Sequence, residues 1–160
     1  MATARFSQYG LSLRYPKAWT RVGWSCEVFV GPTAIAVLTN AQPAPKCPGP
    51  LFQGGSSFPP RQKLGPNVVS ISLTNGTALP VKPHWNGHIK GWPAVIARPV
   101  GHADWWFTCP AGDPAESRSF LIGSPGLLGV TVGICGPDLG AGNRAVNRLL
   151  TSLRFTRHLP

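Results

Sequence analysis

The sequence predicts an α+β domain: an antiparallel sheet meander with a C-terminal helix packed on one face. Short apolar or alternating runs are separated by turn residues, a pattern typical of strands joined by tight connections. The 19 Gly and 18 Pro are spread without a fibre period, so they mark turns and strand ends. Helical periodicity occurs only near the C-terminus. The 160 residues match one domain, so we expect residues 1–160 to form a single globular unit.

The first strand is predicted at Tyr9–Pro16, where apolar and polar residues alternate until the proline ends the run. We expect Trp19 to fold back onto the apolar face of this strand. Val28–Val30 and Thr33–Thr39 predict a hairpin, because Gly and Pro lie between them.

The Pro/Gly-rich segment 42–66 is predicted to be a long loop inside the domain. Val68–Leu73 then predicts another strand, which the turn residues Asn75–Gly76 end. Trp92–Val100 is apolar and β-branched but contains prolines. We therefore expect it at an edge of the sheet, where a missing backbone N–H is tolerated.

The meander is predicted to continue through three successive strands, which turn-rich segments separate. They are Trp105–Cys109, Ser119–Ile122 and Leu128–Ile134.

The last stretch predicts an amphipathic helix, since its apolar residues recur at i, i+3, i+4 and i+7. These residues are Val146, Leu149, Leu150 and Leu153. Asn143 is the expected N-cap, because a capping amide follows the helix breaker Gly142. Leu153–Phe155 is expected to return as a short strand.

Both ends of the chain resemble one known family. Tyr9–Trp19, read Tyr-Gly-Leu-Ser-Leu-Arg-Tyr-Pro-x-x-Trp, resembles the opening strand of PsbP/Mog1-like domains. That family includes the PsbP protein of photosystem II, the nuclear-import factor Mog1, and exported bacterial proteins of actinobacterial type. Asn147–Phe155 resembles the closing helix and strand. The resemblance implies an antiparallel sheet flanked by helices, with a non-catalytic role in binding or assembly. The middle of the chain departs from the family, because it shows no clear second helix.

The cysteines suggest an oxidising compartment. Four widely spaced cysteines without a Cys-x-x-Cys pair fit two disulfides better than a zinc site. Several pairings are open, and we favour Cys26–Cys47 and Cys109–Cys135, because each closes a local strand-loop-strand unit. Four buried free thiols are the alternative.

The charge is strongly positive, with 15 Lys and Arg against five Asp and Glu and a net charge of +10. Such a surface attracts polyanions, although a basic protein without a specific anionic partner is the alternative. Predicted contacts for a ligand or anion are Trp85, Trp105, Trp106, Arg144 and Arg148. Trp offers a stacking face, while Arg holds the anionic group. Burial of the Trp rings in the core is the alternative.

Catalytic chemistry has few candidates. His84, His88, His102 and Asp104 could together hold a zinc-like ion, but they lack the helical His-Glu-x-x-His frame. Surface or hydrogen-bonded histidines in a hairpin are the alternative. The chain contains no Gly-x-Ser-x-Gly motif and no phosphate-binding Gly-rich loop.

These observations predict a non-catalytic exported or cell-surface domain with a binding or assembly role and no cofactor. The first alternative is a binder of a polyanion, which could be nucleic acid, an acidic glycan or a cell-wall polymer. The second is a metal-assisted hydrolase with its site near His84–Asp104. A cell-surface protein is a further possible partner. We expect no transmembrane segment. The N-terminal residues lack the apolar core of a secretion signal, so an exported chain is expected to have lost its signal.

Overall fold

The computed structural model describes residues 2–8, 10–22, 34–41, 62–63, 67–75, 83–101, 107–109, 112–123 and 127–155. In chain order, the elements are β1 (Thr3–Gln8), β2 (Leu11–Pro16), β3 (Thr20–Val22), β4 (Ala34–Thr39), β5 (Gln62–Lys63), β6 (Val68–Asn75), β7 (Gly87–Ile89), β8 (Trp92–Ile96), β9 (Phe107–Thr108), β10 (Ala115–Gly123), β11 (Leu127–Cys135), α2 (Leu139–Thr151) and β12 (Arg154–Phe155). No helix in these ranges is long and apolar enough to cross a bilayer.

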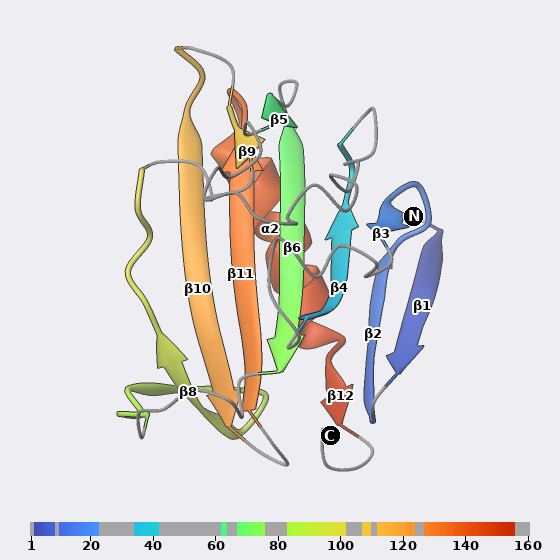
Figure 1. Cartoon of the computed structure of the whole chain (residues 1–160), viewed down its shortest axis with the longest axis vertical. Helices are drawn as coiled ribbons and strands as arrows, with labels where there is room; N and C mark the ends of the chain where they lie inside the picture. The colour runs from blue at the N-terminus through green and yellow to red at the C-terminus, as the bar shows by residue number, and fades with distance from the viewer. Residues whose placement is uncertain are drawn as a thin grey trace, which may run out of the picture.

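A seven-stranded antiparallel sheet forms the body of the domain, in the order β3-β4-β6-β11-β10-β8-β7 (Figure 1). The long strands β6, β11 and β10 lie side by side at its centre. The predicted α+β class, with antiparallel strands and a C-terminal helix packed on the sheet, is confirmed.

The second layer consists of α2 and a small sheet with the order β1-β2-β12. Helix α2 packs on β11 and β6 and also contacts β2. The β1–β2–β12 sheet lies beside it in Figure 1. One helix is too narrow to cover seven strands, and the small sheet adds to the cover; the ring of Phe155 in β12 lies 5.9 Å from that of Trp92 in β8.

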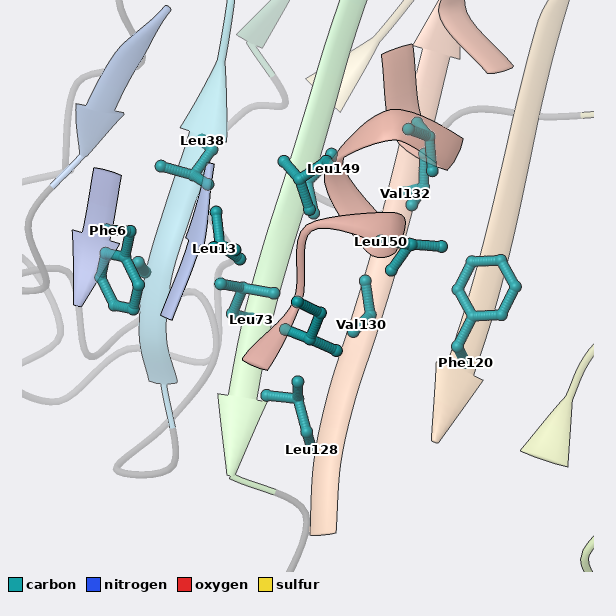
Figure 2. Packing of buried hydrophobic residues seen from close by; sticks show 14 of the residues in the cluster. Phe6, Leu13, Leu38, Leu73, Phe120, Leu128, Val130, Val132, Leu149 and Leu150 are labelled. Atoms are coloured by element: carbon teal, nitrogen blue, oxygen red, sulfur yellow. The ribbon is translucent and has the colours of Figure 1, made fainter. Parts of the chain in front are cut away.

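The core lies between the two layers (Figure 2). Val130 and Val132 of β11 point towards Leu149 and Leu150 of α2, and all four are buried. Side chains of a strand alternate between its two faces. Every second residue before and after Val130 and Val132 in β11 therefore lies on the same face, towards the core. From the small sheet, Phe6, Leu11 and Leu13 join the same apolar cluster.

The side chain of Ser152 joins α2 to β2. Its hydroxyl accepts a hydrogen bond from the Arg14 N–H at 2.8 Å and donates to the Leu149 C=O at 2.7 Å, with the Arg14 C=O 3.2 Å away. Strand β12 pairs Arg154 with Ser12, so Ser152 stands where the next partner of Arg14 would lie. The hydroxyl therefore replaces a backbone rung of the ladder between β2 and β12.

The N-terminus of α2 differs from the prediction. The N-cap is Asp138, whose carboxylate accepts from the Ala141 N–H at 2.8 Å. The N-cap prediction for Asn143 was wrong, because Asn143 lies one turn inside the helix. Its amide instead bridges two side chains of β10, accepting from Arg118 at 2.8 Å and donating to Glu116 at 3.0 Å. This bridge ties the first half of α2 to β10.

The position of β8 also differs from the prediction. Trp92–Ile96 has a neighbour on each side, β10 and β7, so it is not an edge strand. Pro93 is tolerated because the pairing with β10 covers only Ala94–Ile96. The short strand β7 forms the edge and is joined to β8 by a turn in which Lys90 and Gly91 have φ of 56° and 80°. Positive φ at both central residues is the signature of a tight hairpin.

The predicted three-strand meander holds only for its last two strands. Strands β10 and β11 form a hairpin, but β10 takes β8 as its other neighbour. Phe107–Thr108 pairs in parallel with Gln62–Lys63, which lies within the predicted loop 42–66. All other residues of that predicted loop lie outside the described residues, as does the predicted strand Val28–Val30.

The disulfide prediction is confirmed for Cys109–Cys135, whose Cα atoms are 5.4 Å apart. The favoured Cys26–Cys47 pair lies outside the described residues. Within β11, Cys135 follows Ile134, which packs on α2, so Cys135 points to the other face. The bond therefore ties the β9 segment to the face that α2 does not cover, and a loop of this size contributes about 3 kcal/mol to stability.

We predict that Ser152→Ala lowers the free energy of unfolding by about 1 kcal/mol, because the Arg14 N–H loses its acceptor. Urea denaturation monitored by Trp fluorescence measures this change. Thr151→Ala is the matched control, since the Thr151 hydroxyl donates within the helix, to the Asn147 C=O at 2.8 Å. An equal loss in both variants would show that the contact to β2 has no stabilising role.

Candidate ligand groove between α2 and β2

A groove of about 1330 Å³ opens between α2 and the end of β2. One wall is the segment Arg14–Trp19, and the other is the side of α2 that carries Ala141, Ala145 and Arg148. Val69 and Ile134 of the large sheet form part of its floor. Ligand-binding pockets in proteins are typically concave and largely apolar, with a few polar groups that orient the ligand.

Small helix residues create the space. A Cβ added to Gly142 would lie 2.6 Å from Cγ2 of Ile134, so this glycine lets α2 approach the large sheet closely. Ala141 and Ala145 line the groove on the side of β2, and their methyl groups fill little of the gap. The helix is therefore close to the sheet but leaves room beside β2.

The edge of β2 beside the groove offers no free backbone rung. Residues two apart point their backbone groups to the same side of a strand, so Arg14 and Pro16 share the side that faces Ser152. Ser152 occupies the N–H of Arg14. Pro16 has no N–H, and its C=O accepts from Trp19 at 2.9 Å. Recognition in this groove must therefore come from side chains rather than from an added β-strand.

The charged side chains at the groove are mostly positive. Arg14, Lys17 and Arg148 are exposed and line it. Among the described lining residues Asp138 is the acidic one, but its carboxylate already caps α2 and lies 3.7 Å from Arg144. The described part of the lining therefore carries a net positive charge from Arg14, Lys17 and Arg148.

Two aromatic residues accompany these cations. Tyr15 and Trp19 line the groove, and each is half-buried against the core. Because the buried side of each ring already packs on the core, the ring loses little conformational entropy when a ligand packs on its exposed side. The combination of rigid rings and exposed cations suits a ligand with ring-shaped and anionic parts.

Of the predicted ligand contacts that the structure describes, Arg148 lines the groove, whereas Arg144 and Trp85 do not. Arg144 is exposed and paired with Asp138. Trp85 is 43% exposed and lies elsewhere, with its ring over Gly123, where an added Cβ would be 2.3 Å from the indole. Trp105 and Trp106 lie outside the described residues.

The histidine hypothesis gains no geometric support. His84 lies in an irregular segment and His88 in β7, and both are exposed. His102 and Asp104 lie outside the described residues. Within the described ranges, no three His, Cys, Asp or Glu side chains are grouped as metal ligands would be.

Four residues of the groove were not predicted from the sequence: Arg14, Tyr15, Lys17 and Trp19. They fall in the stretch with the family resemblance, where the alternating pattern explains them as strand residues. A clue was available, because two cations and two aromatic rings fall within six residues around a strand end. The pairing of this segment with the far C-terminal helix could not be read from local patterns.

We predict that Asp138→Ala lowers the free energy of unfolding by about 1 kcal/mol, whereas Asp138→Asn changes it by only a few tenths. Asn keeps the capping oxygen and removes the charge, so the two variants separate capping from electrostatics. Thermal and urea denaturation at low salt measure both values. A loss in Asp138→Asn as large as that in Asp138→Ala would mean that charge, rather than the capping hydrogen bond, stabilises this end of α2.

Comparison with known proteins leaves the family open. No protein-family model and no curated protein matches the chain. A crystal structure at 1.50 Å resolution of a protein from Bacteroides thetaiotaomicron VPI-5482 is similar, with a TM-score of 0.48 and 14% sequence identity. The match covers 97% of this chain and 49% of that one, so the chain spans about half the length of that protein.

Proposed function

We propose that this chain is a non-catalytic, extracytoplasmic binding domain whose groove between α2 and β2 holds an acidic glycan. The observation that carries the proposal is the groove itself, which joins three exposed cations to two half-buried aromatic rings. Each part of the proposal rests on a different feature of the molecule.

The positive charge favours an anionic ligand. Arg14, Lys17 and Arg148 surround a space in which Asp138 is already engaged. Arginine forms bidentate hydrogen bonds to carboxylate, sulfate or phosphate groups. The net charge of +10 adds a long-range attraction that speeds association with polyanions.

The shape of the groove favours sugar rings over an extended peptide. An added peptide strand would need free backbone groups on β2, which Ser152 and Pro16 do not provide. The C–H face of a pyranose instead packs on aromatic rings such as Tyr15 and Trp19.

The disulfide supports the compartment. Cys109–Cys135 is compatible with an oxidising, extracytoplasmic location, where disulfides persist. In that setting an acidic glycan is the more accessible polyanion, and nucleic acid is the competing ligand that the experiment must include.

We predict that a heparin tetrasaccharide binds the purified protein, and that Lys17→Gln/Arg148→Gln weakens binding about tenfold, the equivalent of about 1.4 kcal/mol. Isothermal titration calorimetry measures the affinity. The plot of log K against log salt is expected to have a slope of about −2 for three cation contacts, using the coefficient for flexible polyanions. Ala145→Leu should also weaken binding, because its side chain fills the groove without changing charge.

The matched control is Lys90→Gln/Arg98→Gln, which removes the same charge on either side of β8, a strand at the other end of the large sheet from β3 and β4 (Figure 1). Its affinity should stay within about twofold of the wild type. Equal losses in both double variants would reduce the effect to net charge and contradict a site in the groove. Tighter binding of single-stranded DNA than of any glycan would contradict the ligand class.

A further inference from the structure

We infer that the outer face of the β1–β2–β12 sheet extends the groove into a longer site for a polyanion whose charges are tetrahedral oxyanion esters. The inference rests on the proposed function and names the ligand class more closely. It starts from three arginines, Arg5, Arg14 and Arg154, which we call the arginine strip. All three are exposed.

The register of the small sheet places these arginines together. Arg5 lies directly opposite Arg14, and Arg154 lies opposite Ser12, which puts it diagonally next to Arg14. Directly opposite residues have Cβ atoms about 5 Å apart, and diagonal neighbours are about 7 Å apart. The inner face of the same strands carries Phe6, Leu11 and Leu13, so the strip lies on the face that points away from the core.

The arrangement is unfavourable for folding. Like charges directly opposite in a sheet are destabilising, and β1, β2 and β12 contain no Asp or Glu at all. A residue pattern that breaks a local rule without a structural gain is typical of a functional site. Among the described residues no acidic side chain pairs with these arginines, so we expect a ligand to supply the counter-charge.

The strip is continuous with the groove. Arg14 belongs to both, because it also lines the cavity. Its backbone is bonded to Ser152, and Arg148 lies one helical turn before Ser152 on the same side of α2. A linear ligand can thus run from Lys17 and Arg148 past Arg14 and onto Arg5 and Arg154.

Neighbouring arginines favour sulfate or phosphate esters over carboxylates. One bidentate arginine occupies both oxygens of a carboxylate. A tetrahedral ester group offers three terminal acceptor oxygens, so two arginines such as Arg5 and Arg14 can share it. The preferred ligand is therefore a sulfated or phosphorylated glycan several residues long.

The test compares ligand length and chemistry on the same protein. A heparin dodecasaccharide should bind more tightly than the tetrasaccharide, and Arg5→Gln and Arg154→Gln, each alone, should weaken dodecasaccharide binding about fivefold. Tetrasaccharide binding should stay within about twofold, because the groove is intact. Arg98→Gln is the matched single-charge control and should leave both unchanged. Oligogalacturonate of similar length, which carries only carboxylates, should gain little from its length.

A stability measurement separates a ligand site from a structural role. Arg5→Gln should keep or raise the thermal midpoint at low salt, because it removes the repulsion opposite Arg14, while it weakens binding of the long glycan. Two results would contradict a role of the arginine strip in binding while leaving the groove as a site. The first is that the dodecasaccharide binds no more tightly than the tetrasaccharide. The second is that Arg5→Gln and Arg98→Gln weaken dodecasaccharide binding equally. If the affinity for oligogalacturonate rose with its length as much as the affinity for heparin does, the preference for sulfate or phosphate esters would be contradicted. Absence of binding to every heparin fragment would overturn both proposals.

Discussion

The contact between the Ser152 hydroxyl and the backbone of Arg14 positions the second layer of this domain. It lies at the end of α2, immediately before the chain becomes β12, and it continues the ladder by which β2 holds β12. The three-stranded sheet and the helix are thereby joined as one layer. The groove lies between them, and both Arg14 and Ser152 belong to its lining.

Side-chain size then determines where the layer is tight and where it is open. Gly142 lets α2 approach Ile134, and the bridge from Asn143 ties the helix to β10. The leucines of the helix are consequently directed into the core, while Ala141 and Ala145 line the groove. The packing side of the helix and the groove meet at Gly142 and Leu149, which also belong to the groove lining.

Much of the fold was predictable from local patterns, because alternation and the i, i+3, i+4, i+7 spacing directly report which face is buried. The strands around Leu13, Ile71 and Val130 and the helix around Leu149 follow from that signal. The Asn143 cap and the edge position of β8 were wrong because they depend on partners distant in sequence. Asp138 caps the helix one turn earlier, and β7 covers the edge of β8.

The site was less predictable for the same reason. Arg148 was identified from charge alone, but its neighbours Arg14 and Trp19 come from the other end of the chain. The arginine strip becomes visible only with the register of β1 and β2, since neither strand alone carries an unusual charge pattern. Strand pairing between distant segments is the information that local sequence patterns lack.

The most direct test of this account is a ¹H–¹⁵N correlation spectrum of the labelled protein during titration with the heparin tetrasaccharide, followed at the Trp indole N–H signals. Trp19 lines the groove, whereas Trp85 is exposed but packs over Gly123 at a different place. Assignment uses the Trp19→Phe and Trp85→Phe variants. The account predicts that the Trp19 signal shifts with saturation while the Trp85 signal stays in place. A saturating shift of Trp85 with an unchanged Trp19 signal would contradict a ligand site between α2 and β2.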